Sequence, residues 1–199
     1  MIRFNLQKVG FVLAIITLPS FAQAAVSAWK IVPEKSEITF TATQNRAPLK
    51  GSFKTFTGEI KFDREQLDKS DVKIVIDIGS LAAVDSDIIK TLLTPDWFDA
   101  AKFPKAVFTA NAFAKSGKSK TGEDTYQAKG KLTIRDKTIP VTLSFVFKEY
   151  SPKEAQAIGE TSIKRTEFGV GQGEWSSSAV VEDIVQVSFV LTATSSIKE

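Results

Sequence analysis

The sequence predicts an all-β fold: an antiparallel β-barrel of about eight strands with one short helix and an aromatic connector. Three observations support this prediction. Segments of alternating apolar and polar residues recur along the chain, as in strands that bury one face. Polar, turn-forming stretches separate these segments at hairpin-like spacing, and a helical pattern occurs in one place. Strands in this order close naturally into a barrel, because closure removes the exposed edges of the sheet.

Eight segments carry the alternating pattern. Gly58 interrupts the second segment, which predicts a bulge or bend at that point. In the fourth segment Phe108 is opposite in phase to Phe113, so the two side chains are expected on opposite faces. The polar residues 115–124 are expected to form a loop after it. The segments are 36–43, 51–62, 72–78, 106–114, 126–134, 139–148, 155–164 and 185–191.

The helical pattern lies between the third and fourth segments. Asp85 offers a side-chain cap for the first turn, and Pro95 cannot continue a helix, so the chain must turn there. The connector that follows, residues 96–104, is short and rich in aromatic side chains. In an all-β protein, one helix with such a connector has the form expected of a lid or plug over a barrel. The apolar face of the helix consists of Ile88, Ile89, Leu92 and Leu93.

Residues 1–24 have the form of a cleaved signal peptide. Arg3 and Lys8 precede an apolar run, residues 9–18, that is too short for the roughly twenty residues of a membrane-spanning helix. Residues 22–24, Ala-Gln-Ala, have the small-x-small form of a cleavage site. We therefore expect export and one mature domain, residues 25–199; a retained membrane anchor is the alternative.

The composition excludes several classes of function. The chain has no cysteine, which excludes disulfides, thiol catalysis and iron–sulfur ligation. It has no histidine, which removes Ser-His-Asp chemistry, imidazole general bases and most zinc or haem sites. Loss of the two basic residues of the signal segment lowers the formal net charge from +3 to +1. The basic isoelectric point is therefore poor evidence for nucleic-acid binding, and we expect no nucleic-acid partner.

Several motifs resemble those of one known family. Residues 97–108, Trp-Phe-Asp-Ala-Ala-Lys-Phe-Pro-Lys-Ala-Val-Phe, look like the signature of the YceI-like family of exported polyisoprenoid-binding proteins. Residues 51–58 are similar to the family's early hairpin, and residues 130–134 together with 137–143 to its central one. Residues 165–169, Arg-Thr-Glu-Phe-Gly, resemble its late turn. The motifs follow the family's order over essentially the whole mature chain, which departs from many members in having no histidine around the helix.

This resemblance implies an extended lipocalin-like barrel with a long apolar tunnel, a periplasmic location and an isoprenoid ligand such as a quinone or a polyprenyl lipid. The protein would transport, store or sense that lipid or another long-chain amphiphile, with no further cofactor. Burial of a prenyl chain is favourable by about 0.8 kcal/mol per CH₂ before ordering costs. For each candidate lining residue, a place in the ordinary core is the alternative. The candidates are Phe40, Phe53, Phe56, Phe62, Ile74, Ile76, Leu92, Trp97, Phe98, Phe103, Phe108, Phe145 and Phe168.

Two other classes of function stay open from the residues alone. A hydrolytic enzyme would use Ser-x-x-Lys at 27–30 and Lys-Thr-Gly at 120–122, but the middle element of that serine-enzyme set is missing and chance explains the match better. Carboxylate pairs at 96/99 and 182/183 suit acid–base work or calcium, although turns and caps explain them as well. We expect no enzyme. A small membrane-embedded barrel, apolar outside and polar inside, is compatible with export.

Two further interactions are candidates. Lys115, Lys118 and Lys120 lie in the expected polar loop and would allow transient docking on anionic lipid head groups at a membrane surface. A solvated hairpin loop is the simpler interpretation of these lysines. A dimer is one candidate assembly.

Overall fold

The computed structural model describes residues 26–196 of the chain. The predicted signal peptide, residues 1–24, lies outside the described residues. Within them the structure has one α-helix, α1 (Ser86–Leu92), and five short 3-10 turns: η1 (Pro33–Lys35), η2 (Leu67–Lys69), η3 (Ile78–Ser80), η4 (Arg165–Phe168) and η5 (Gly173–Trp175). The strands are β1 (Ala28–Ile31), β2 (Glu37–Gln44), β3 (Ala47–Phe53), β4 (Phe56–Lys61), β5 (Asp71–Asp77), β6 (Leu81–Ala83), β7 (Lys105–Lys118), β8 (Asp124–Ile134), β9 (Lys137–Tyr150), β10 (Glu154–Lys164) and β11 (Ile184–Ser195).

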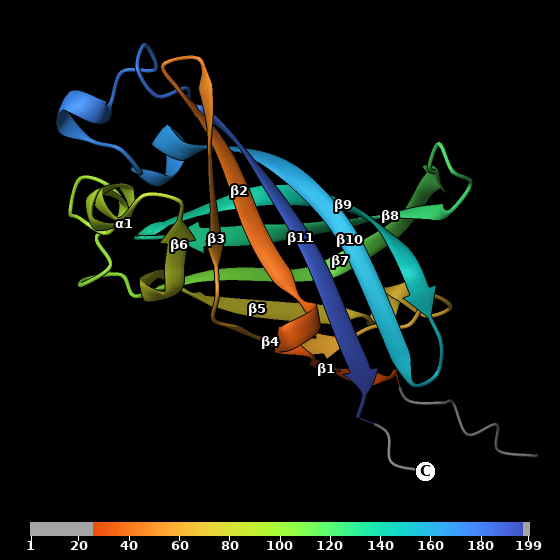
Figure 1. The fold of residues 1–199 in the computed structure, drawn as a ribbon. Coiled ribbons are helices and arrows are strands. Elements are labelled where there is room, and N and C mark those ends of the chain that lie inside the picture. The colour runs from red at the N-terminus through yellow and green to blue at the C-terminus, as the bar shows by residue number, and fades with distance from the viewer. Residues whose placement is uncertain (1–25, 197–199) are drawn as a thin grey trace, which may run out of the picture.

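The strands form a closed antiparallel barrel with eight positions around its circumference (Figure 1). The order β1-β4-β5-β7-β8-β9-β10-β11 closes on itself because β1 also pairs with β11. The remaining three strands extend the wall at one end. β1 and β2 pair with different parts of β11, β3 pairs with β2, and β6 pairs with β3. The prediction of an eight-stranded antiparallel barrel is confirmed.

The helix and the connector cover one end of this barrel. β6 pairs with β3, whereas β7 begins at Lys105, opposite Asp77 of β5, so the chain between β6 and β7 spans an opening in the wall. Asp85 caps α1 by accepting a hydrogen bond of 2.7 Å from the backbone N–H of Asp87, as predicted. The loop that carries η4 and η5 lies at the same end of the barrel (Figure 1).

Two details of the strand prediction are wrong. The break in the second segment falls at residues 54–55, and Gly58 lies inside β4, opposite Ile74. A Cβ on Gly58 would lie 2.5 Å from Cδ1 of Ile31, so the missing side chain makes room for packing and produces no bend. The predicted loop at 115–124 is also too long, because β7 and β8 extend into it and leave residues 119–123 as the turn.

A β-bulge in β7 reverses the predicted phase of Phe113. The register with β8 shifts between Ala110 and Ala112, where one extra residue is inserted. Phe108 and Phe113 therefore face the same interior space, although strict alternation places them on opposite faces. The sequence pattern also misses β1 and β6, which have four and three residues and are too short to show alternation.

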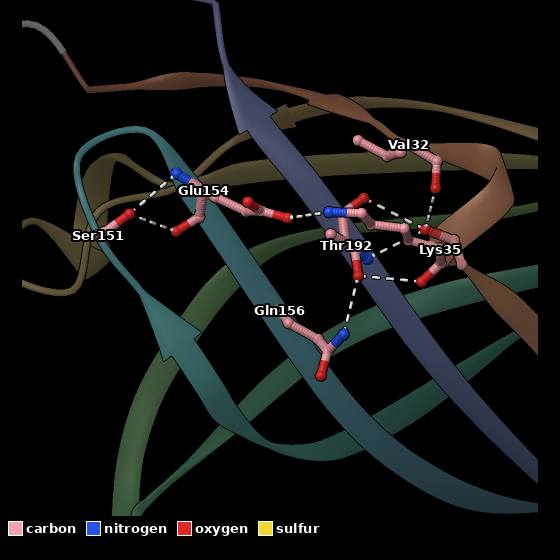
Figure 2. Close-up of polar contacts among 7 residues, drawn as sticks. Val32, Lys35, Ser151, Glu154, Gln156 and Thr192 are labelled. Atoms are coloured by element: carbon pink, nitrogen blue, oxygen red, sulfur yellow. Dashed lines mark hydrogen bonds and ion pairs between the residues drawn. The ribbon is translucent and has the colours of Figure 1, made fainter.

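A polar network fixes the corner between β1 and β2, at the end of the barrel away from α1 (Figure 2). The Thr192 side chain is almost completely buried, and its hydroxyl donates to the Lys35 carbonyl oxygen at 2.9 Å and accepts from Gln156 Nε2 at 3.0 Å. The Ser36 hydroxyl accepts from the Thr192 N–H at 3.0 Å and donates to the Val32 carbonyl oxygen at 2.8 Å. These bonds hold the corner in place, so that β1 and β2 can both pair with β11.

Candidate functional site

The interior of the barrel contains two adjacent cavities. The wide cavity, about 320 Å³, lies at the α1 end, and the narrow cavity, about 170 Å³, lies toward β1 and the β9–β10 turn. Four residues line both of them, so the two cavities are neighbours along the barrel interior, and together they are called the passage below. Most of the lining side chains are apolar, and the wide cavity falls in the range of roughly 300–1,000 Å³ typical of small-molecule sites. The shared residues are Ile38, Ile76, Leu132 and Val187.

The aromatic connector is a fixed part of the wall of the wide cavity. From the β8–β9 turn, Arg135 donates hydrogen bonds to the carbonyl oxygens of Trp97 in the connector and of Pro95 just before it. From the loop after β10, the backbone N–H groups of Gly171 and Gln172 both donate to the Asp96 carbonyl oxygen, at 2.9 and 2.7 Å. The connector is therefore tied to the barrel on both sides.

Arg165 organises the loop after β10. Its side chain is only 3% exposed, and Gly171, which it contacts, has a φ of +79°. A Cβ on Gly171 would lie 2.2 Å from the guanidinium, so this turn requires glycine. Burial lowers the pKa of Arg165 and nearby Asp183 raises it, but an arginine pKa is high enough that the group stays charged. The guanidinium donates to six carbonyl oxygens at 2.8–3.3 Å, those of Val170, Gly171, Trp175, Ser177, Val181 and Glu182.

Trp97 lies between this loop and the wide cavity. Its ring centre is 5.6 Å from the guanidinium carbon of Arg165 and 5.6 Å from the ring centre of Trp175. Trp97 is 6% exposed, and within the described residues its buried indole Nε1 has no hydrogen-bond partner. At the narrow cavity, by contrast, the indole Nε1 of Trp29 donates to the Phe62 carbonyl oxygen at 2.9 Å.

Aromatic rings crowd the wall of the narrow cavity. The ring of Phe62 is the centre of this group, with five ring centres at 5.3–6.4 Å from its own. Most of these contacts are edge-to-face or tilted, the arrangements that aromatic pairs favour. The rings therefore pack as an ordered cluster and reduce the width of the passage at this end. The neighbours of Phe62 are Phe113, Tyr126, Phe145, Phe147 and Tyr150.

The structure places eleven of the thirteen predicted lining residues along the passage. Phe56 and Phe103 line neither cavity: Phe56 is buried in the core, and the Phe103 ring lies 5.5 Å from the Arg135 guanidinium. Contact of any of these residues with a ligand stays a prediction. The wide cavity is lined by Phe40, Phe53, Ile76, Leu92, Trp97, Phe98 and Phe168, and the narrow cavity by Phe62, Ile74, Ile76, Phe108 and Phe145.

Sequence reasoning missed other lining residues for two reasons. Phe147, Phe189 and Leu191 alternate in phase with predicted inward positions, so the strand pattern could have identified them. Trp29 lies on a strand too short to show a pattern. Arg165 appears in the sequence as part of a motif, but its burial depends on a loop that folds around it.

Two of the four carboxylates considered for acid–base work or calcium, Asp99 and Asp183, have structural partners. Asp99 lies 3.9 Å from Arg135. Burial opposes ionisation of Asp183, but hydrogen bonds from Thr166 and the nearby Arg165 charge outweigh it and keep its pKa below the usual value. Across residues 26–196 there is no group of three or more acidic, histidine or cysteine residues that could hold a metal ion. No helix in that range has the length and apolar character needed to cross a membrane.

Two of the three lysines predicted to dock on lipid at the β7–β8 turn, Lys115 and Lys118, are also paired. Lys115 and Lys118 both lie 2.7 Å from Asp124, so part of the basic charge of this hairpin is already matched. Hydrogen bonds, the strongest from Lys148, lower the pKa of Glu123 to about 2. Docking of these lysines on anionic lipid stays a prediction.

Known proteins share both the sequence and the fold. A family model for the YceI-like domain matches residues 29–193. A UPF0312 protein of Vibrio campbellii is 28% identical over 127 residues, which cover 61% of this chain and 65% of that protein. The chain thus spans less than two thirds of the length of this relative. Protein YceI of Salmonella arizonae is 29% identical over 147 residues, 71% of this chain and 74% of that protein.

Solved structures agree with this assignment. The crystal structure of BcnA from Burkholderia cenocepacia is 33% identical, with a TM-score of 0.76 over 82% of this chain and 99% of that chain. A polyisoprenoid binding domain from Saccharophagus degradans has a TM-score of 0.66 at 14% identity, over 85% of this chain and 99% of that chain, and shows the shared fold. On the family model, the relatives and the barrel, this chain belongs to the YceI-like family.

Proposed function

We propose that this protein holds an isoprenoid chain, that of a quinone or a polyprenyl lipid, in the apolar passage of its barrel. The observation that supports this most directly is that two apolar cavities lie next to each other inside the barrel and share Ile38, Ile76, Leu132 and Val187. An elongated apolar space suits a prenyl chain, whose burial contributes about 0.8 kcal/mol per CH₂. The Saccharophagus degradans neighbour, which shares the fold, is described as a polyisoprenoid binding domain.

The proposed role is binding for transport, storage or sensing, with the lipid as ligand and without catalysis. We propose that it acts in the periplasm after export. The main alternative, a membrane-embedded barrel, would direct apolar side chains outward and polar ones inward. Here the inward faces are apolar, and outward-facing Lys129 and Lys131 of β8 are exposed, which favours the lipid-binding proposal. The dimer and the transient membrane contact stay predictions.

The direct test is mass spectrometry of an organic-solvent extract of the protein purified after native export. We expect a stoichiometric isoprenoid lipid. Leu92→Trp places a bulky indole in the wide cavity where a smaller aliphatic side chain lies. It should reduce the lipid load to a small fraction of that of the unsubstituted protein. Val84→Trp is the matched control, because Val84 precedes the same helix but is fully exposed and should keep the load.

Two results would contradict the proposal. A lipid-free protein that also fails to bind added quinone or polyprenyl lipid would mean that the passage is only a loosely packed core. A folded Leu92→Trp variant with an unchanged lipid load would mean that the lipid binds somewhere other than the wide cavity.

A further inference from the structure

The two sections of the passage differ in polarity. The wide cavity is lined by several side chains that carry hydrogen-bonding or charged groups, among them Gln44, Thr91 and Arg165. The narrow cavity is lined mainly by aliphatic and aromatic groups, and the indole N–H of its Trp29 is already satisfied by the Phe62 carbonyl oxygen. A ligand with one polar end and one apolar end would therefore find different surroundings in the two sections.

Trp97 contributes an unpaired hydrogen-bond donor to the wall of the wide cavity. Its indole N–H is a donor without an acceptor, in a side chain that is 6% exposed. Buried donors are almost always paired, and an unpaired one calls for an explanation. An oxygen atom on a ligand would supply the missing acceptor.

Arg165 brings a buried positive charge close to Trp97. All of its hydrogen bonds described above go to backbone carbonyl oxygens, which carry no formal charge, and the carboxylate that acts on it is that of Asp183. Its donors are occupied by these carbonyls, so a ligand would sense the charge of the guanidinium without bonding to it directly. With the guanidinium carbon 5.6 Å from the Trp97 ring centre, this charge favours an electron-rich group beside Trp97.

We propose that the isoprenoid binds in one orientation, with an oxygen-bearing head in the wide cavity, where Trp97 Nε1 donates a hydrogen bond to it, and the prenyl tail in the narrow cavity. This inference rests on the proposed function and adds the position and chemistry of the head: a carbonyl or hydroxyl oxygen that accepts a hydrogen bond. Because Nε1 is enclosed in the structure, a small rotation of the Trp97 ring accompanies binding. The direction follows the barrel axis, from the α1 end to the β9–β10 turn (Figure 1).

The first test compares a lipid with an oxygen head and one without. Purified delipidated protein is titrated with a short-chain ubiquinone and, separately, with squalene, which has no oxygen. Trp97→Phe keeps an aromatic ring but removes the N–H group. It should weaken ubiquinone binding roughly fivefold, the value of one net hydrogen bond, and change squalene binding far less.

The second test locates the head directly. Quinone rings quench tryptophan fluorescence at close range, and the chain has three tryptophans, Trp29 at the narrow cavity and Trp97 and Trp175 at the wide one. Bound ubiquinone should quench the Trp29→Phe variant strongly. A Trp97→Phe/Trp175→Phe variant, which retains Trp29, should be quenched weakly.

The outcomes separate this inference from the proposed function. If the unsubstituted protein binds neither lipid, the proposed function fails. If it binds both, and Trp97→Phe weakens both equally or neither, the head position is wrong while lipid binding stands. Strong quenching of Trp29 would place the head in the narrow cavity and overturn the orientation. Should Trp97→Phe fail to fold, the Trp29→Phe variant alone decides the question. If ubiquinone no longer quenches that variant strongly, the head lies near Trp29 in the narrow cavity and the proposed orientation is wrong.

Discussion

Replacement of Arg165 by methionine should remove a large part of the protein's free energy of unfolding. Methionine keeps the unbranched apolar stem but removes a guanidinium that donates to six carbonyl oxygens at 2.8–3.3 Å. Each hydrogen bond from a charged group is worth about 1.5–3 kcal/mol, but these values do not add, since the loop can relax and expose some carbonyls to water. Loss of one partner from a buried charged network costs about 3–5 kcal/mol. We expect a loss in that range, out of a typical total of about 5–15 kcal/mol.

The measurement is urea unfolding followed by tryptophan fluorescence, in which Trp97 and Trp175 report on the affected region. Lys164→Met is the matched control. Lys164 is the preceding residue, is exposed, and forms a 3.6 Å surface ion pair with Glu167, so its loss should cost less than about 1 kcal/mol. If Arg165→Met costs no more than this control, the carbonyl oxygens do not depend on the guanidinium, and the account of the loop is wrong.

Two further predictions concern the opposite end of the barrel and the β7–β8 turn. Thr192→Val, which keeps the side-chain shape but removes a buried hydroxyl with two hydrogen-bond partners, should lower the free energy of unfolding by about 1–3 kcal/mol, whereas Thr194→Val at an exposed site of the same strand should have little effect. Glu123 has a folded pKa of about 2 against a usual 4.5, so its ionised form is favoured in the folded state; its contribution is complete above about pH 4.5 and disappears as the pH falls toward 2. The second prediction would be contradicted by an NMR titration that finds the Glu123 pKa at its usual value. It would also be contradicted if a Glu123→Gln variant lost as much stability below pH 4.5 as the unsubstituted protein does.

Local features made much of the fold predictable. The two ends of α1 follow from Asp85 and Pro95, which act on their immediate neighbours whatever the tertiary context. The long strands follow from the alternation of apolar and polar residues, which is already compatible with burial of one face of each strand. The bulge in β7 was not predictable in the same way, because it exists only in the pairing with β8 and leaves no mark in the residues around Asn111. For the same reason the phase of Phe113 could not be read from its own strand.

The sequence predicted which strand faces point inward, but it did not predict which inward residues line a cavity and which pack in the core. Phe53 and Phe56 illustrate the difference, since both are large apolar residues of the same sequence segment. Phe53 lines the wide cavity, whereas Phe56 is buried in the core after the break at residues 54–55. Arg165 is a stronger case: an arginine after a strand suggests exposure, yet carbonyl oxygens from residues 170–182 enclose it. Its burial is set by residues that follow it and by the turn that Gly171 permits.

The small inward residues explain why the barrel keeps an interior space at all. Three glycines each have an aromatic ring where a Cβ would be. A Cβ on Gly51 would lie 2.3 Å from the Phe40 ring, one on Gly130 2.8 Å from the Phe108 ring, and one on Gly159 2.5 Å from the Phe189 ring. All three rings line the passage, and the glycines let them approach the barrel wall closely. Small inward residues in a barrel have two usual interpretations, that they leave holes or that they fit a tapering core. The structure supports a third: the glycines seat aromatic rings at the wall, and the passage lies between rings that are held back from the axis.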